Sequence, residues 1–382
     1  MAIERSRRTL VILGARLVTA LVVGGIVWAV GQGDDSTTHS STPSPNSPGT
    51  SATTTTASTG TTGSSAVAGA TTGLVLDPNH DFGNEYADGI LPVGDGKYST
   101  DAPSTGTVYV CRAPQGGGGA QSRGPWFVNN DTEYDLNQKV SVEGAVPWTA
   151  SYSMTIAGDT RTIATNDLPR DHTTGVFPVQ PSDPAYVYDR NPNQIAAQSL
   201  SYALDATPTI ASSPGCVGGE VGVMMTGVAL FDAFDAGGRD AGAWEVQDGC
   251  DGHPQMSSEY HYHTLSSCID DASVRSVIGF ALDGFPITGP KIADGNILTT
   301  KDLDECHGIT SAIDLDGKSV TMYHYVMTQD FPYSASCFRG TAAQAPRSGS
   351  GRIPSIASIR NLVDTPPFAV KPPVFPPDAS TR

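Results

Sequence analysis

Two long segments whose composition does not suit a packed core bound the part of this chain that can fold. Residues 35–73 are dominated by Ser, Thr, Gly, Pro and Ala, and such a segment cannot bury enough apolar surface to offset the entropy lost on ordering it. Beyond residue 340, three Pro-Pro pairs favour an extended polyproline conformation over packing. We therefore predict a disordered Ser/Thr/Pro-rich linker over residues 32–73, one folded domain over residues 74–340 and a disordered Pro-rich tail over residues 341–382.

The first 31 residues have the pattern of an export segment. Three arginines among residues 5–8 precede an uncharged apolar stretch over residues 17–30. As a helix this stretch would span about 21 Å, less than the roughly 30 Å of a bilayer core, whereas a helix starting at Thr9 would span about 33 Å. A cleaved signal peptide and an uncleaved membrane anchor, that is a transmembrane helix, therefore both remain open. The paired arginines also resemble a twin-arginine export signal, and we expect a secreted or cell-envelope protein that meets the membrane only through this segment.

Net charge limits the partners of the folded part. The whole chain has a formal net charge of −17, and its first 31 residues contribute +3, so the remainder carries −20. This acidic remainder argues against nucleic acid and against anionic membrane surfaces as partners, and it fits cation binding. Neither a Gly-x-Ser-x-Gly motif nor a Gly-rich phosphate loop is present, which disfavours serine-nucleophile and nucleotide-dependent enzymes. The sequence indicates no particular soluble partner or substrate.

Six cysteines fit an oxidising compartment and three disulfide bonds. Six cysteines allow fifteen pairings, and the prediction made here is Cys111–Cys216, Cys250–Cys268 and Cys306–Cys337. The second pair would close a loop around the histidine-rich segment described below. Cysteine thiolates as metal ligands are the weaker alternative, because the chain has no Cys-x-x-Cys motif.

Apolar patterning and turn residues indicate a β-rich domain. We predict strands at residues 107–110 and 222–231, and hairpins at residues 152–165 and 311–328, each with a Gly-Asp or Asp-Gly pair at its turn. Residues 276–282 suit either a brief helix or a strand. Gly and Pro interrupt the rest of the domain. The prediction is therefore a mainly β fold, an antiparallel β-sandwich-like domain with long loops, stapled by disulfides.

Residues 260–263 read Tyr-His-Tyr-His in a chain with only eight His. On a β-strand, His261 and His263 project from one face, and Tyr260 and Tyr262 project from the other. His253 lies shortly upstream. Because imidazole is the commonest protein ligand for zinc and copper ions, we interpret His253, His261 and His263 as candidate ligands of a divalent transition metal, Zn²⁺ or Cu²⁺. The two tyrosines are then auxiliary residues that pack or hydrogen-bond, and imidazoles satisfied by backbone carbonyls are the structural alternative.

Two further residues are candidates for an auxiliary role near the metal. Asp283 can supply a carboxylate ligand or an acceptor that orients an imidazole, although an Asp-Gly pair also suits a turn. His324 belongs to a second Tyr-His-Tyr run, and on a strand it shares its face with apolar residues. We therefore expect a buried structural or auxiliary imidazole there. His307 follows Cys306 in a polar turn and is expected to be exposed.

Calcium is a weaker candidate than a transition metal. Asp232, Asp235 and Asp240 surround a Gly-Gly pair and could form a Ca²⁺ loop. Their spacing is not that of an EF-hand, and Asp and Gly are common in turns of every kind. A transition metal therefore remains the first expectation.

Several ordered motifs resemble the YHYH domain family. They are the Tyr-His-Tyr-His run at 260–263, the Gly-His-Pro run at 252–254, and the segments at 282–287, 303–306 and 330–340. The match is strong over residues 220–340 and loose before them. The resemblance implies exported, mostly bacterial, poorly characterised proteins, and it implies a domain and a compartment more than a chemistry. Thr288 and His307 depart from the family pattern we expect, which concerns local contacts only.

Three functions remain open on these residues. The first is metal binding through the histidine cluster. The second is a metal-dependent hydrolase, in which Glu259 or Asp283 could act as general base; which residues would be catalytic, and whether the protein is an enzyme, stays open. The third is a non-enzymatic cell-surface binding or structural module in which the Tyr-His strand is packed core. Convergence of the three imidazoles on a point within metal-bonding reach would favour the first two functions.

Overall fold

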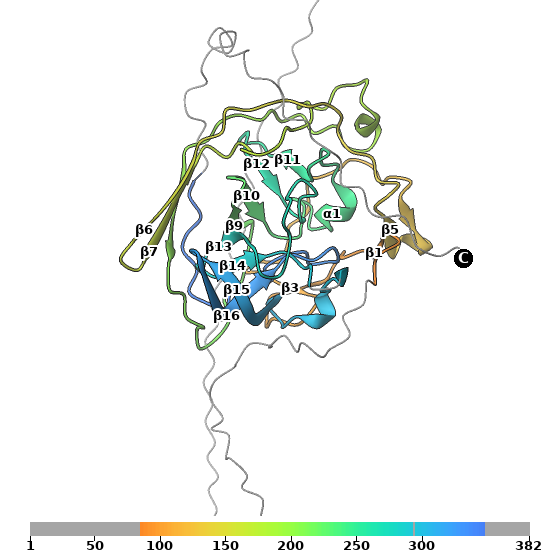
Figure 1. Cartoon of the computed structure of the whole chain (residues 1–382). Helices are drawn as coiled ribbons and strands as arrows, with labels where there is room; N and C mark the ends of the chain where they lie inside the picture. Colours follow the sequence, from red (N-terminus) through yellow and green to blue (C-terminus); the bar gives the residue numbers. More distant parts are fainter. Residues whose placement is uncertain (1–84, 293–294, 348–382) are drawn as a thin grey trace, which may run out of the picture. The chain divides into compact units, whose positions relative to one another are not determined.

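An eight-stranded sheet lies at the centre of the folded domain in this computed structural model (Figure 1). The structure describes residues 85–292 and 295–347, all within the compact unit Val67–Arg382. The export segment predicted over residues 1–31, the linker predicted over residues 32–73 and most of the predicted tail lie outside the described residues. Within the described residues, no helix has the length and apolar character needed to span a bilayer.

The order of strands across the central sheet is β11-β12-β10-β9-β13-β14-β16-β15. These strands are β9 (Glu220–Met224), β10 (Ala229–Phe231), β11 (Gly252–Pro254), β12 (Tyr260–Tyr262), β13 (Val277–Ala281), β14 (Pro286–Thr288), β15 (Gly308–Leu315) and β16 (Lys318–Val326). Neighbouring strands are antiparallel except for two parallel pairs, β10 with β12 and β14 with β16. The predicted mainly β fold is confirmed, with parallel pairing at these two places as an addition.

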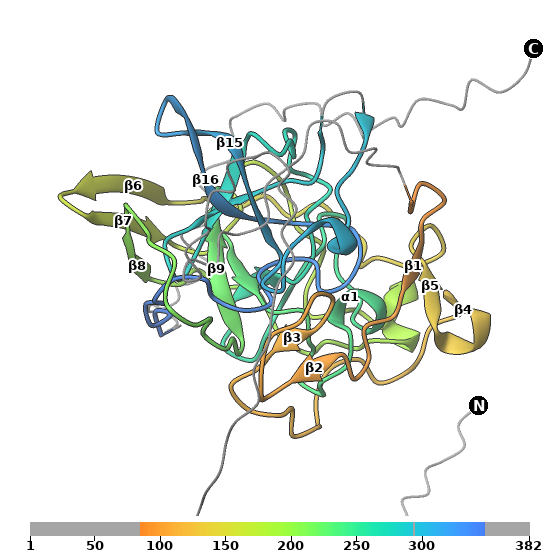
Figure 2. The same ribbon diagram turned by 90° about the horizontal axis from the view of Figure 1, so that it is seen from below.

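Smaller sheets flank the central sheet. Strands β6 (Tyr152–Ala157), β7 (Thr160–Thr165) and β8 (Leu200–Asp205) form an antiparallel sheet on one side, and β1 (Ile90–Pro92), β5 (Glu133–Asp135) and β4 (Phe127–Val128) form one on the opposite side (Figure 2). Strands β2 (Tyr98–Ser99) and β3 (Val108–Tyr109) form a two-stranded parallel sheet. The helices are short: α1 (Ala241–Trp244) and the 3₁₀ turns Asn129–Asp131, Pro184–Val187 and Thr300–Asp302.

Turn chemistry explains why both predicted hairpins form where expected. The β6–β7 hairpin turns at Gly158, whose φ is +59°, and the β15–β16 hairpin turns at Asp316 and Gly317, with φ of +50° and +74°. Two consecutive positive φ angles are those of the tight turn whose twist matches paired strands, and Asp-Gly is a favoured pair for it. Residues 276–282, left open between helix and strand, contain strand β13.

The single strand predicted over residues 222–231 is wrong. The segment forms two antiparallel strands, β9 and β10, joined by a turn in which Gly227 adopts a φ of +93°. Strands β9 and β10 are buried at nearly every position, as in a sheet covered on both faces. Because such strands lack polar alternation, the apolar run gave no sign of where the first strand ends.

All three predicted disulfides are present: Cys111–Cys216, Cys250–Cys268 and Cys306–Cys337. The Cys250–Cys268 bond closes a loop with a sequence separation of 18, which corresponds to about 3 kcal/mol of constraint on the unfolded chain in the loop-entropy model. The loop begins beside β11 and contains β12, so it ties together the strands that carry the histidine cluster. Three disulfides indicate folding in an oxidising, extracytoplasmic compartment.

Candidate metal centre

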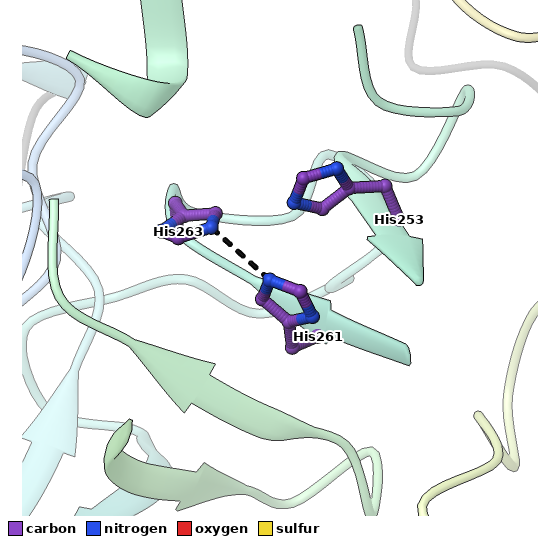
Figure 3. Close-up of side chains that lie close together, drawn as sticks. All are labelled: His253, His261 and His263. Carbon is purple, nitrogen blue, oxygen red and sulfur yellow. Dashed lines mark hydrogen bonds between the residues drawn. The ribbon is translucent and has the colours of Figure 1, made fainter. Parts of the chain in front are cut away.

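Two adjacent strands bring three imidazoles together. His253 lies on β11 directly opposite His261 on β12, and His263, two residues after His261, is brought to the same face of the strand. The Nε2 atoms of His261 and His263 are 3.1 Å apart, and one ligand nitrogen from each of the three residues lies within 4.8 Å of the others (Figure 3). The three residues predicted as ligands therefore form one buried group that could hold a metal ion.

The spacing of these nitrogens can be compared with that around a bound ion. Metal–nitrogen bonds of about 2.0–2.1 Å in a tetrahedron separate the ligand nitrogens by about 3.3–3.4 Å. The separation of 3.1 Å between His261 and His263 is close to that value. Since no separation in the group exceeds 4.8 Å, an approach of about 1.5 Å or less brings the third imidazole to bonding distance.

Backbone carbonyls set the orientation of two of the imidazoles. The Nδ1 atom of His261 lies 3.3 Å from the carbonyl oxygen of Glu259, and Nδ1 of His263 hydrogen-bonds to the carbonyl oxygen of Asp232. A carbonyl oxygen only accepts, so Nδ1–H donates in both residues and each Nε2 keeps its lone pair. Orienting contacts of this kind are typical of metal-binding imidazoles.

A carboxylate that the sequence analysis did not identify completes the group. Glu245 ends the short helix α1, whose first turn is capped by the side chain of Asp240. The Oε2 atom of Glu245 lies 3.3 Å from Nε2 of His253 and 3.5 Å from Nε2 of His263. An Asp followed by small helix-forming residues could have indicated the helix, but nothing in the sequence indicated that its end faces β11 and β12.

Several polar atoms at this centre are buried without a partner. Among the described residues, neither ring nitrogen of His253 has a hydrogen bond, and Oε2 of Glu245 has none either. A buried polar atom left unsatisfied costs about 1–3 kcal/mol, and native proteins contain few of them. A cation there would give a partner to Oε2 of Glu245 and to the ring nitrogen of His253 that faces it, so the donor set fits a metal ion.

Burial determines the protonation of the four groups. It lowers the pKa of His263 to about 4 and holds the pKa values of His253 and His261 well below the ordinary imidazole value. It also raises the pKa of Glu245 well above that of an ordinary carboxyl group. An ion pair between Glu245 and a charged imidazole would shift these pKa values in the opposite directions, so the loss of solvation dominates. The imidazoles are therefore neutral near pH 7, which is the form that binds metals.

The imidazoles line a cavity of about 760 Å³. Glu245 and Phe231 line it with them, together with Asn193 and Met256, a residue that is 92% exposed. The Phe231 ring lies 4.2 Å from the His261 ring, centre to centre. A cavity of this size is in the range of small-molecule sites, and all three imidazoles belong to residues that line it.

The two tyrosines of the motif point away from this cavity, as strand geometry predicts. The hydroxyl of Tyr260 donates to the carboxylate of Asp248 at 3.0 Å. The hydroxyl of Tyr262 hydrogen-bonds to Nε2 of His172 at 3.0 Å and lies 3.4 Å from Oγ1 of Thr226. Both side chains are buried in the main hydrophobic core, so they anchor the strand that presents the imidazoles.

Asp283 and His324 lie in a different part of the sheet. The Asp283 carboxylate accepts hydrogen bonds from the Tyr325 hydroxyl at 2.6 Å and from the Gly340 amide at 2.8 Å, and it belongs to no metal-binding group of the described residues. Asp283 was expected to contact the imidazoles of the cluster. It instead bonds to Tyr325 on β16 and to Gly340, and so lies in the other half of the sheet. His324 is buried as predicted, with Nδ1 3.0 Å from Oγ1 of Thr288 and Nε2 2.8 Å from Oγ of Ser311.

His307 and the three aspartates of the calcium alternative also have structural partners. The prediction that His307 is exposed is wrong: it is 1% exposed, and its Nε2 lies 2.9 Å from Oγ1 of Thr328. Asp232 accepts two backbone amides, Asp235 pairs with Arg239, and Asp240 caps α1 and accepts from Tyr333. These three carboxylates therefore serve separate turns and caps, and they do not form a calcium loop.

Comparison with known proteins agrees with the motif. Residues 201–300 match the model of the family described as YHYH protein, so the resemblance seen in the sequence is confirmed over this segment. The match contains β9 to β14 and all three histidines of the cluster. No curated protein and no solved structure gives a significant match to the chain.

Proposed function

From a chain whose residues 201–300 carry the YHYH family pattern, we propose a protein that binds one divalent transition metal ion through His253, His261 and His263, with Glu245 beside them. The observation that carries the proposal is the contact of 3.1 Å between the Nε2 atoms of His261 and His263. Since Nδ1–H donates to a carbonyl in both rings, two lone pairs face each other across this gap. They cannot hydrogen-bond to each other, and a cation between them removes their repulsion.

The donor set selects the class of metal. Three imidazoles and one carboxylate suit Zn²⁺ or Cu²⁺, whereas Ca²⁺ and Mg²⁺ prefer sites built from oxygen atoms. A bound ion would also satisfy Oε2 of Glu245 and the ring nitrogen of His253 that faces it. The buried atoms without a hydrogen bond and the spacing of the ligand nitrogens therefore both support a divalent transition metal ion.

Metal analysis of the purified full-length protein tests this proposal. We expect close to one equivalent of zinc or copper after loading and removal of free metal, and a rise in Tm on loading. The variant His261→Ala/His263→Ala should lose the metal and the rise in Tm. His307→Asn is a matched control, because it removes a buried imidazole outside the cluster. Wild-type protein without a bound ion, or an equal metal content in the double variant, would contradict the proposal.

A second candidate function, a metal-dependent hydrolase, is favoured by the cavity of about 760 Å³ beside the imidazoles. A bound ion in such a site would supply Lewis acidity and an activated water. Glu245 is the carboxylate placed to hold a proton at this centre, whereas Asp283 is bonded elsewhere. Assays with chromogenic esters, amides and phosphate esters test this function: turnover that requires metal and is lost in Glu245→Gln with the metal retained supports it, and its absence across all three classes opposes it.

The same site can also serve a non-enzymatic module outside the cytoplasm. The three disulfides support the compartment, and residues 1–31 supply the pattern of an export segment. We propose that the domain is secreted or held at the cell envelope, away from nucleic acid. Sequencing the N-terminus of the protein recovered from cell fractions distinguishes a cleaved signal from an anchor, and recovery in the cytoplasm with reduced cysteines would contradict export.

A further inference from the structure

We propose that the central sheet consists of two copies of one four-stranded unit, and that the second copy contains a closed form of the imidazole site. The first copy is β9 to β12 and the second is β13 to β16. Neither the family match nor the metal proposal includes this relationship. This relationship separates the residues of the Tyr-His-Tyr-His segment into two groups. The tyrosines hold the four-stranded unit together, and the histidines form the candidate metal site.

Sequence similarity between the first hairpins of the two copies follows a constant spacing. Residues 221–223 read Val-Gly-Val and residues 278–280 read Ile-Gly-Phe, 57 positions later. At the same spacing, the Gly-Val-Ala-Leu run that starts at Gly227 is matched by the Gly-Phe-Pro-Ile run that starts at Gly284. Both of these glycines have positive φ, +93° and +86°, and each turns the first hairpin of its copy.

The second hairpins also correspond. Asp248-Gly-Cys-Asp-Gly252 is matched by Asp304-Glu-Cys-His-Gly308, and Tyr-His-Tyr at 260–262 is matched by Tyr-His-Tyr at 323–325. The residue between Cys and Gly has positive φ in both copies, +65° at Asp251 and +70° at His307. Each copy also begins a disulfide at the equivalent cysteine, Cys250 or Cys306.

Strand pairing repeats in register. Each copy pairs its first two strands antiparallel, its last two strands antiparallel, and its second and fourth strands parallel. Gly252 lies opposite Tyr262 as Gly308 lies opposite Tyr325. Leu230 also lies beside Tyr262 as Ile287 lies beside Tyr325. A one-residue slip would turn every side chain to the other face, so agreement in all pairings requires the same three-dimensional unit.

The two copies meet about a local two-fold axis. Strands β9 and β13 pair antiparallel with Val223 opposite Phe280, and these two residues are each other's counterparts in the alignment. The hydrogen bonds on either side are equivalent: the Met225 amide donates to the Ile278 carbonyl at 2.7 Å, and the Leu282 amide donates to the Val221 carbonyl at 2.9 Å. Self-complementary pairing of this kind is what a two-fold axis between equal units requires.

Buried hydrogen bonds of the tyrosines repeat as well. The hydroxyl of Tyr260 donates to Asp248 at 3.0 Å, and the hydroxyl of Tyr323 donates to Asp304 at 3.1 Å. Each aspartate accepts the amides of the cysteine and glycine that follow it. The second tyrosine of each run contacts the residue before the turn glycine, with Tyr262 on Thr226 and Tyr325 on Asp283. The same bonds occur in the first copy, which has the histidine cluster, and in the second copy, where none is found among the described residues. They therefore stabilise the four-stranded unit and do not depend on the metal site.

The copies differ at the positions that form the cluster. His261 corresponds to His324, but His253 corresponds to Ile309, which lies opposite His324 in the same register. His263 corresponds to Val326. Both nitrogens of His324 have hydroxyl partners, Thr288 and Ser311, and no metal-binding group is found there among the described residues. The second site is therefore closed by two apolar side chains and two hydroxyl groups.

Exchange of these positions between the copies tests the proposal. His253→Ile/His263→Val gives the first copy the side chains of the second. We expect the metal-free variant to fold with three disulfides and to melt at or above the Tm of the metal-free wild type, because the exchange removes the buried His253 imidazole, neither nitrogen of which has a hydrogen bond. His253→Asp/His263→Asp, which no copy contains at these positions, is the control and should melt lower. A folded yield or Tm of the first variant as low as that of the control would overturn the proposal.

The reverse exchange opens the second site and rests on the proposed metal function. Ile309→His/Val326→His is placed in a chain that also carries His261→Ala/His263→Ala, so the first site cannot contribute. With added Co²⁺ we expect the visible absorption of a nitrogen-ligated ion at one equivalent, and none in the chain with His261→Ala/His263→Ala alone. If the wild type binds metal and the opened variant folds without binding it, the duplication of the site is overturned while the metal function stands. If no form binds metal, the metal function fails, and the Tm of the first exchange still decides the duplication.

Discussion

Oε2 of Glu245 lies 3.3 Å from Nε2 of His253, and neither atom has a hydrogen bond to any of the described residues. The same oxygen lies 3.5 Å from Nε2 of His263, so one carboxylate oxygen faces two imidazoles in a buried space. Each atom left without a partner there costs about 1–3 kcal/mol. A cation bound at this contact would therefore add to the stability of the fold.

Replacing Glu245 by Gln should weaken metal binding without removing it. The amide keeps the shape of the side chain but cannot ionise beside a bound ion as a carboxyl group can, and loss of such a neighbour costs about 10–100-fold in metal affinity. Competition with a chromogenic chelator measures the change. Glu143→Gln, at an exposed position, is the control for loss of one charge. An affinity equal to that of the wild type would mean that Glu245 does not face the ion.

The buried His307 should make the protein sensitive to acid. Burial lowers its pKa to about 3, so the unfolded chain takes up a proton below pH 6.5 while the folded chain does not, and stability is lost as pH falls from about 6.5 towards 3. His307→Asn removes this loss, and Asn tolerates the positive φ of +70° at this position. Unfolding of both metal-free proteins at pH 4, 5, 6 and 7 measures the effect, since the other titrating groups are common to both. The variant should gain relative to the wild type as pH falls, and parallel curves would contradict this.

Removal of the Cys250–Cys268 bond should loosen the candidate metal centre more than removal of another disulfide. In the loop-entropy model the bond constrains the unfolded chain by about 3 kcal/mol, and its loop contains strand β12. Cys250→Ser/Cys268→Ser should therefore lower the Tm and also reduce metal affinity. Cys111→Ser/Cys216→Ser is the comparison, because that bond lies outside the two strands and should lower the Tm alone. Equal metal affinity in both double variants would show that the loop does not hold the site.

A methyl group at Gly252 should disturb the strand that carries the histidines. A Cβ at this position would come within 2.2 Å of the Tyr260 ring, and overpacking of this kind costs about 1–3 kcal/mol. Gly252→Ala should therefore lower the Tm and reduce metal binding, as measured by thermal unfolding and metal content. Gly249→Ala is a matched control three residues away, because a Cβ there meets nothing within 4 Å. Equal effects of the two changes would show that the contact with Tyr260 is not limiting.

The parts of the fold that could be predicted from the sequence are those with local causes. The β15–β16 hairpin follows from Asp316 and Gly317, and the convergence of His261 and His263 follows from the period of a strand. The single strand expected over residues 222–231 failed because both faces of β9 are buried, which removes the alternation that marks a strand's end.

The unpredicted parts of the candidate site depend on contacts between distant segments. Glu245 reaches the cluster from the end of α1, a placement set by packing. Asp283 was expected there but meets Tyr325, the counterpart of Tyr262 in the second copy. His307 looked exposed because its neighbours are polar, yet Thr328 provides its buried partner. Comparing the sequence with itself would have shown the spacing of 57 residues between Gly227 and Gly284, and the repeated Tyr-His-Tyr run at 260–262 and 323–325.

The pairing of β9 with β13 through Val223 and Phe280 has the form of a subunit interface, enclosed within one polypeptide. In a homodimer every substitution appears twice, so a change that removes a ligand removes it from both sites. In a covalently joined pair, one unit can give up its ligands for apolar packing while the other keeps them. The two units of the joined form can therefore have different functions. The unit around His324 stabilises the fold, and the unit around His261 keeps buried polar atoms to which a ligand can bind.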